Sequence, residues 1–152
     1  MQIIKEHTVH SILFSTDKRR LDVKYIHQFL SNDSYWAKGI PLKLVQRSIE
    51  NSLTIGVYEA QKQIGFARVI TDYATFGYLA DVFIDAEYRA RGLSKTLMEF
   101  IVSIDELKDL RRILLATRDA HSLYVQYGFK PLGIPDSFME LHQPGIYKKY
   151  AP

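Results

Sequence analysis

The sequence predicts an α/β fold, because a helical pattern lies between two almost continuous apolar segments in the middle of the chain. Residues 79–84 and 113–117 lack the apolar–polar alternation of a half-exposed strand, which is typical of strands covered on both faces. Between residues 93 and 104 the apolar side chains recur at helical spacing. A strand, a helix and a strand of this length form a parallel unit with a right-handed crossover. We therefore expect one domain over residues 1–152.

The first fifty residues predict one strand and two helices. Weak alternation over residues 9–14 indicates the strand. Helical spacing of apolar residues from Leu21 to Leu30 predicts a helix that ends at the polar cluster of residues 31–34. Pro41 suits the first position of a second helix. The apolar stripe of this second helix consists of Leu42, Val45 and Ile49.

An antiparallel hairpin precedes the parallel unit, and short elements follow it. Residues 53–60 and 63–70 both favour strands and are joined by a short polar connection, as in a hairpin. Residues 71–77 are expected to form a loop into the next strand. A helix is predicted over residues 119–127, and Gly128 ends it. Two short strand candidates come last, at residues 129–132 and 137–142.

Composition excludes several classes of protein and of site. The chain has 152 residues, of which 47% are hydrophobic, and this is ample material for one core. Twenty Lys and Arg against 17 Asp and Glu leave a net charge of +3, which does not indicate a nucleic-acid binder. Because there is no cysteine, a thiol nucleophile and a zinc–thiolate site are excluded, and we expect no metal. No run of about 18 apolar residues predicts a membrane span, so we expect a cytoplasmic protein.

A turn rich in cations connects the first strand of the parallel unit to its helix. Its sequence, EYRARGLSKTLMEF, places Arg89 and Arg91 beside Gly92, just before the helix begins. The first N–H groups of a helix favour phosphate, and a glycine lets the phosphate approach the backbone. Both arginines and the hydroxyl of Ser94 could add contacts to the anion. The alternative interpretation is a solvated basic turn in which the glycine only permits bending.

Two motifs in this half of the chain resemble those of a known family. RARGLS followed by KTLM is similar to the acyl-CoA pyrophosphate motif of the GNAT N-acetyltransferases: Arg or Gln, two residues, Gly, one residue, then Gly or Ala. Further along, DAHSLYVQYGFKPL resembles the second signature of the family, a helix with LY a few residues before GF. The resemblance covers essentially the whole chain. The sequence departs from the family pattern at Ser94, where Gly or Ala is usual, and at Ala90, where Gly is frequent.

The resemblance implies a mixed central sheet of about six or seven strands with about four helices, and acetyl-CoA as the co-substrate. The strand around residues 81–84 would splay from the strand at 113–117 and open a cleft for pantetheine. Backbone groups near Val82, Phe83 and Ile84 would pair with the pantetheine arm, and the backbone at Phe83 would stabilise the oxyanion of the tetrahedral intermediate. The residues implied for the pyrophosphate cradle are Arg89, Ala90, Arg91, Gly92, Leu93, Ser94 and Lys95.

The resemblance also implies that the amine attacks directly and that Tyr124 is the general acid. A phenol with a pKa near ~10 is protonated at neutral pH and can donate to the leaving thiolate. The residues alone favour a packing role for Tyr124, because it shares helical spacing with the apolar side chains of Leu123 and Tyr127, and the motif reverses that preference. His121 could contact the cofactor or only occupy the first turn of its helix.

The acceptor site is less clearly specified. In the family the loop between the first two helices covers the acceptor, and here that loop carries Tyr35, Trp36 and Lys38. The alternative for Trp36 is an aromatic anchor that fixes the loop on the core. Asp72, Tyr73 and Asp81 flank the central strands and could bind or deprotonate an amine, although such residues are more often turn or edge residues.

These features together predict an acetyl-CoA-dependent N-acetyltransferase. Its expected acceptor is the amine of a small molecule or of a protein, and a homodimer is possible. Two alternatives from other classes remain open: a CoA sensor or interaction module without turnover, and a nucleic-acid binder. The nucleic-acid binder would use Arg89, Arg91, Arg111 and Arg112 and would show steeply salt-dependent binding.

Overall fold

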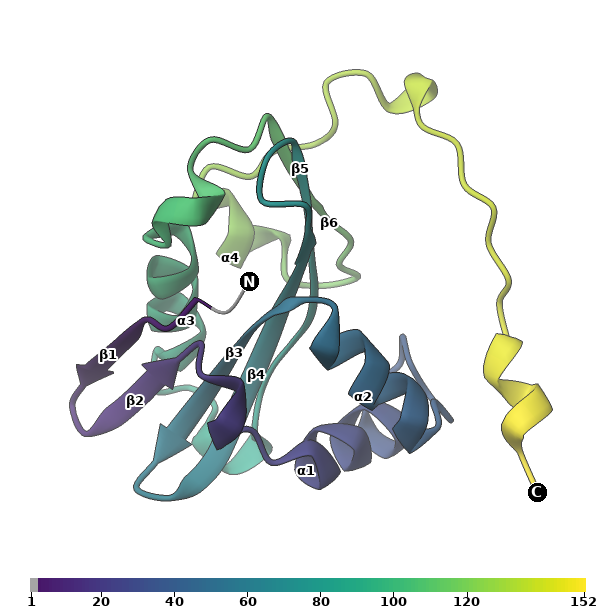
Figure 1. The fold of residues 1–152 in the computed structure, drawn as a ribbon. Helices are drawn as coiled ribbons and strands as arrows, with labels where there is room; N and C mark the ends of the chain where they lie inside the picture. Colours follow the sequence, from purple (N-terminus) through teal and green to yellow (C-terminus); the bar gives the residue numbers. More distant parts are fainter. Residues whose placement is uncertain (1–2) are drawn as a thin grey trace.

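The computed structural model describes residues 3–152, which contain a six-stranded mixed sheet with helices on both faces (Figure 1). The strands lie in chain order across the sheet, and every neighbouring pair is antiparallel except β5 and β6, which are parallel. The strands are β1 (Glu6–Val9), β2 (Ile12–Ser15), β3 (Leu53–Glu59), β4 (Lys62–Thr71), β5 (Phe76–Ile84) and β6 (Arg112–Leu115). The predicted α/β class and the parallel unit around the central helix are both confirmed.

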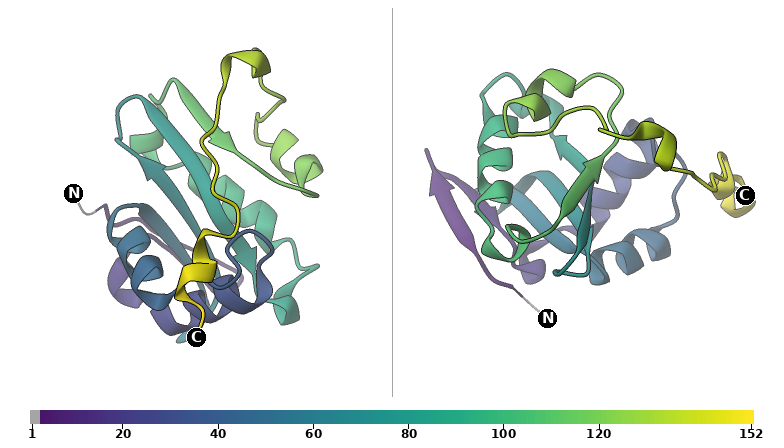
Figure 2. Two further views of the ribbon diagram at one scale, coloured as in Figure 1. Left: turned by 90° about the vertical axis from the view of Figure 1, so that its right-hand side faces the viewer. Right: turned by 90° about the horizontal axis from the view of Figure 1, so that it is seen from above.

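Four α-helices cover the sheet, two on each face (Figures 1 and 2). α1 (Val23–Gln28) and α2 (Leu42–Glu50) cover one face, and α3 (Leu93–Val102) and α4 (His121–Val125) cover the other. Pro41 is the N-cap of α2 rather than its first helical residue. Within residues 3–152, no helix combines the length and the apolar character needed to cross a bilayer.

Each pair of helices encloses its own apolar core against the sheet. Between the sheet and α3 the most buried side chains include Phe14, Ile64 and Leu97. On the opposite face, Phe66 and Phe83 of the sheet pack with residues of α1 and α2. Phe83 therefore anchors the end of β5 on the α1–α2 side, close to the place where the chain turns towards α3.

The predicted first strand is wrong, because residues 9–14 contain a turn. β1 and β2 form an antiparallel hairpin in which Val9 pairs with Ile12. The two residues between them, His10 and Ser11, both have left-handed backbones, with φ of 49° and 67°. Positive φ at both central positions gives a turn whose twist matches that of the flanking strands. Such turns usually contain Asn or Gly, and neither residue is present here to indicate a turn.

The two strand candidates at the end of the chain are also wrong. Residues 129–132 and 137–142 are not paired with any strand among residues 3–152; the only regular structure after α4 consists of short 3-10 turns at Pro135–Ser137 and Ile146–Tyr150. Figure 1 and the right-hand view of Figure 2 both show the stretch between these turns running apart from the sheet. A strand needs a neighbour for its backbone groups, and this stretch has none in its own chain.

Candidate active site

β5 and β6 stop pairing before β5 ends, and we call the place beside the unpaired end of β5 the opening. Their pairing runs from Phe76 opposite Arg112 to Leu79 opposite Leu115, where β6 ends. β5 continues without this neighbour as far as Ile84. Beyond Leu79 the backbone of β5 has no partner in β6, as the predicted splay requires, and it borders the opening.

A bulge in β5 lies at the start of this opening. The register between β4 and β5 shifts between Phe66 and Arg68, and opposite that shift Asp81 has a left-handed backbone with φ of 54°. A bulge bends its strand and redirects the backbone groups that follow. A non-glycine residue with positive φ is disfavoured, so the surrounding contacts must hold it in place.

The carboxylate of Asp81 supplies those contacts. Trp36 Nε1 donates to its Oδ1 at 2.7 Å, and Arg68 Nε donates to its Oδ2 at 2.6 Å. The side chains of Asp81 and Arg68 are only 8% and 16% exposed, so the ion pair is well shielded from water. Arg68 Nη1 also donates to Ser52 Oγ at 3.1 Å. Both oxygens of Asp81 are thus engaged, and the residue joins the bulge to the loop that carries Trp36.

The turn between β5 and α3 adopts a conformation that small residues favour. Ala90 and Gly92 both have left-handed backbones, with φ of 63° and 76°. The turn is held from behind, because Arg89 Nε donates to the carbonyl of Ile84 at 3.1 Å. The positive φ of Ala90 gives a physical reason for the frequent glycine at this position in the family motif, since alanine pays a steric cost there.

The amino end of α3 is open. Gly92 is its N-cap and gives no side-chain cap, and the first intrahelical bond is donated by Thr96 N–H to Gly92 O at 3.2 Å. The N–H groups of residues 93–95 therefore precede the hydrogen-bonded turns and can bind an anion. A Cβ atom placed on Gly92 would have no neighbouring atom within 4 Å, so this space is empty of protein. Arg91 lies over the ring of Tyr88, with 4.9 Å from Cζ to the ring centroid.

Tyr124 lies on α4 and is 8% exposed. Its ring packs edge-on against Phe129, with 5.9 Å between ring centroids. Burial raises the pKa of the Tyr124 phenol above its ordinary value, and the nearby Tyr35 and Asp119 raise it further. A raised pKa keeps the phenol protonated through the neutral range, so that it can act as a proton donor.

The loop between α1 and α2 connects the two sides of the opening. Tyr35 and Trp36 pack edge to face, with 5.0 Å between their ring centroids. Trp36 binds Asp81 of β5, as described above. On the other side, the backbone N–H of Arg118 donates to Tyr35 Oη at 3.1 Å, and the Arg118 guanidinium lies 3.9 Å from the Tyr35 ring centroid. The two aromatic residues are nevertheless 47% and 42% exposed, so they present a surface to a ligand.

The family model for the acetyltransferase (GNAT) domain matches residues 50–131, which include the open turn, α3 and Tyr124. This match covers more than half of the chain. The chain belongs to the GNAT acetyltransferase family.

Similar proteins agree with this assignment. A Gibberella zeae protein named as a candidate acetyltransferase is 31% identical over 144 residues, which cover 82% of this chain and 79% of that protein. The crystal structure of a candidate GNAT acetyltransferase from Xanthomonas campestris is 51% identical, with a TM-score of 0.88, and covers 93% of this chain and 99% of that one. A Clostridium acetobutylicum structure solved with acetyl-CoA shares the fold at 18% identity and a TM-score of 0.57, over 80% of this chain and 92% of that one. GNAT acetyltransferases use acetyl-CoA.

The predicted backbone site for pantetheine falls on the unpaired end of β5. Val82, Phe83 and Ile84 lie on the unpaired part of β5, directly before the open turn. The Phe83 side chain points into the core, where its ring stacks on Phe29 at 3.8 Å between centroids, so only its backbone faces the opening. Tyr35 is near enough to Tyr124 to influence the pKa of its phenol.

Other predicted residues lie elsewhere. Asp72 and Tyr73 are in the turn before β5, at the opposite end of that strand from Asp81. Asp72 accepts hydrogen bonds from the hydroxyl and backbone of Thr75, which hold the pKa of its carboxyl well below the usual range. The structure thus does not place either residue at the opening. His121 begins α4 and is exposed, as is Lys38.

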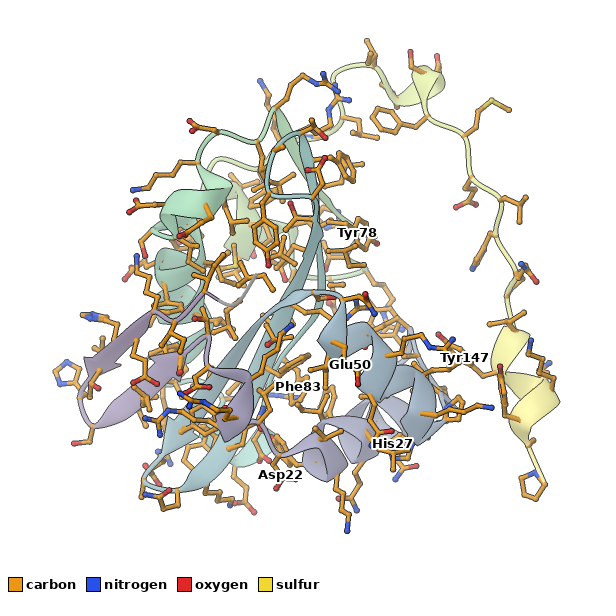
Figure 3. All side chains as sticks on the ribbon, in the orientation of Figure 1. Asp22, His27, Glu50, Tyr78, Phe83 and Tyr147 are labelled. Atoms are coloured by element: carbon orange, nitrogen blue, oxygen red, sulfur yellow. The ribbon has the colours of Figure 1, made fainter. Side chains whose placement is uncertain are left out.

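Three residues near the opening were missed in the sequence. Arg68 stood alone in an otherwise apolar strand, and a lone charge in a buried strand needs a partner, so it could have been found. Arg118 and Tyr147 carried no such signal. Tyr147 comes from the last 3-10 turn, on the side of α2 (Figure 3). Tyr147 packs against the α1–α2 core, and both burial and the negative charge of Asp81 raise the pKa of its phenol. Within residues 3–152 no cluster of His, Asp and Glu is arranged to hold a metal ion.

Proposed function

We propose that this protein is an acetyl-CoA-dependent N-acetyltransferase that transfers the acetyl group directly to an amine. The observation that carries the proposal is the convergence of three features on the opening between β5 and β6. These features are the uncapped amino end of α3 at Gly92, the unpaired backbone of β5 beyond Leu79, and the buried phenol of Tyr124. They supply an anion site, a strand edge and a proton donor along one line.

The open turn would bind the pyrophosphate of acetyl-CoA. The N–H groups of residues 93–95 offer donors beside the positive end of the α3 dipole. Arg91 and Lys95 add positive charge on the same turn, while Arg89 is held against the carbonyl of Ile84 and supports the turn itself. The empty space over Gly92 leaves room for the phosphate to approach the backbone. The pantetheine arm would then follow the unpaired edge of β5.

The acceptor amine would attack the thioester carbonyl, forming a C–N bond as the C–S bond breaks. Negative charge on the carbonyl oxygen would be stabilised by the backbone N–H near Phe83, where the bulge has redirected the strand. The departing thiolate would take its proton from Tyr124. The proton that the amine must lose would pass to solvent, because Trp36 and Arg68 already engage both carboxylate oxygens of Asp81.

The acceptor would bind between the aromatic loop and Tyr147. Tyr35 and Trp36 offer exposed aromatic surface, and Arg118 and Lys38 offer positive charge for an acceptor carboxylate. Asp81 is engaged by Arg68 and Trp36, so the opening has little unpaired negative charge for a polyamine. We therefore expect a small acceptor with one reactive amine and an apolar or aromatic portion.

The test is release of free CoA from acetyl-CoA with a panel of amines, combined with mass spectrometry of the acetylated product. Amino acids, arylalkylamines, peptides with a free amino terminus and polyamines cover the alternatives. We expect acetylation of a monoamine with an aromatic or carboxylate group. Tight acetyl-CoA binding without turnover on any class of amine would instead favour a sensor of acyl-CoA.

A further inference from the structure

A groove runs along β6 and α4, next to the segment that follows α4. We call it the edge groove. Its cavity is about 230 Å³ in volume. The side chains that line it are mainly apolar and include Leu114, Leu115, Val125, Phe129 and Leu132; Tyr124 and His121 of α4 also line it, so it adjoins the candidate active site. β6 is the last strand of the sheet, and among residues 3–152 its outer backbone groups pair with no other strand. The edge groove therefore combines apolar surface with a strand edge that can accept a further strand.

The residues that we call the arm, 137–142, have the composition of such a strand. Their sequence is SFMELH, and in the structure Met139 is 98% exposed and Leu141 is 88% exposed. These alternate positions would lie on one face of an extended segment. Two large apolar side chains that protrude almost completely into solvent are unusual unless they meet a partner. The arm runs apart from the sheet in Figures 1 and 2.

Contacts at both ends hold the arm away from its own edge groove. Near its start, the ring of Phe138 lies 5.1 Å from the guanidinium of Arg112. Beyond its end, Tyr147 packs on the α1–α2 core and Lys43 lies over the ring of Tyr150 at 5.1 Å. The chain between these anchors is thus displayed outwards, and the edge groove of the same chain is not filled by it.

We propose that the edge groove binds the arm of a second copy of this chain, so that two copies exchange arms in a symmetric dimer. Each copy has one arm and one groove, and a two-fold arrangement lets both pairs form at once and closes the assembly. Met139 and Leu141 match the apolar lining. Glu140, the one carboxylate of the arm, matches Lys130, the one lysine or arginine among the described residues that line the groove.

The first test is the oligomeric state of the purified chain by sedimentation velocity over a range of micromolar concentrations. Wild-type protein is expected to sediment as a dimer. The double variant Met139→Lys/Leu141→Lys is expected to sediment as a monomer with an unchanged circular dichroism spectrum. The control Ile4→Lys/Ile70→Lys changes two exposed apolar residues outside the groove and is expected to stay dimeric. A monomeric wild type, or a double variant that remains a dimer, overturns the proposal.

A second test identifies which groove the arm enters. Because the chain has no cysteine, the introduced cysteines are the only thiols that can react. Leu141→Cys and Val125→Cys chains are mixed, left to exchange subunits and treated with a short bismaleimide. We expect a covalent dimer with one chain of each kind. Gln61→Cys, in the exposed turn between β3 and β4, replaces Val125→Cys as a control and is expected to give none. A single chain that carries both Leu141→Cys and Val125→Cys is treated in the same way. If it cross-links within itself while the mixed chains give no covalent dimer, the groove takes its own arm and the exchange is wrong.

Discussion

The two ends of the opening between β5 and β6 are built in different ways. The end assigned to acetyl-CoA consists of consecutive residues from the end of β5 to the first turn of α3, and backbone groups supply most of it. The acceptor end consists of side chains from widely separated segments. These side chains are Tyr35, Trp36, Arg68, Asp81, Arg118 and Tyr147. The residues of the first kind of site are consecutive in the sequence, whereas folding must bring together the residues of the second kind.

This difference leads to separable effects of mutation. A backbone site depends on φ angles and open space, so it is sensitive to a residue that changes either at Gly92. A side-chain site depends on several separate hydrogen bonds. The loss of one of them should therefore lower the affinity for the acceptor by a smaller factor. In the proposed reaction the phenol of Tyr124 serves the chemical step, so we expect its removal to lower the rate more than a change at either end.

The largest effect is expected for Tyr124→Phe. Removing a positioned proton donor lowers kcat by about 10² to 10⁴. The Kd of acetyl-CoA and the Tm should change little, because the ring still fills its place against Phe129. Steady-state kinetics and calorimetric binding on the same preparations measure both quantities.

A matched control for this variant is Tyr58→Phe. Tyr58 is also buried, and its hydroxyl has no hydrogen-bond partner within residues 3–152; it lies on β3, which β4 separates from β5. It should retain wild-type kcat. If Tyr124→Phe also turns over at the wild-type rate, with chemistry rate-limiting, Tyr124 is only a packing residue.

The next largest effect is expected for Gly92→Val. The new side chain would occupy the space above the α3 amino end that we assign to the pyrophosphate, so the Kd of acetyl-CoA should rise by more than about tenfold. The acetyl-CoA-dependent increase in Tm should disappear at the same ligand concentration, since stabilisation follows binding to the folded state.

Gly128→Val separates this ligand effect from backbone strain. Gly128 also has a positive φ, 93°, and open space around its Cβ position, but it lies after α4 and outside the open turn. Both variants should lose stability through the forced left-handed backbone. Only Gly92→Val should lose the acetyl-CoA-dependent increase in Tm. An equal increase in both variants would show that this turn does not bind the pyrophosphate.

The fold was largely predictable because its central elements have strong local patterns. The parallel unit, its helix and the β3–β4 hairpin follow from apolar runs, helical spacing and a polar connection. The hairpin at His10 and Ser11 was missed because its positive φ angles are imposed by the sheet rather than by turn-forming residues. The strand candidate at 137–142 shows the converse: its composition favours a strand, but its own chain provides no neighbour.

The candidate site divides in the same way. Arg91, Gly92 and Tyr124 were identified from motifs, since a short stretch of chain fixes where each stands on its helix or turn. The bond from Trp36 to Asp81 and the approach of Tyr147 join residues far apart in the sequence, and no local pattern encodes such contacts. Asp72 was predicted at the site because it flanks a central strand, and the structure places it at the end of β5 opposite the bulge at Asp81.

A smaller effect, confined to the acceptor end, is expected for Trp36→Phe. The variant keeps an aromatic ring beside Tyr35 but loses the Nε1 donor to Asp81. Losing one partly exposed hydrogen bond to a charged group should raise the acceptor KM by about tenfold and leave the acetyl-CoA KM nearly unchanged. Equal increases in both KM values would mean that the loop does not belong to the acceptor end alone.

The smallest effect is expected for Asp72→Ala, which tests whether the far end of β5 has any part in acceptor binding. The acceptor KM should not change, because the carboxylate serves only the turn that it caps.

Folding lowers the pKa of Asp72, so the ionised carboxylate stabilises the fold above its unfolded pKa of about 4. This contribution is lost as the pH falls below that value. The Tm of the variant should therefore lie below that of the wild type at pH 7, and the two should converge as the pH is lowered towards about 2. Thermal unfolding followed across this pH range measures the convergence. A Tm difference that stays constant with pH would show that the charge of Asp72 is not what stabilises the turn, and a several-fold rise in acceptor KM would return this residue to the binding site.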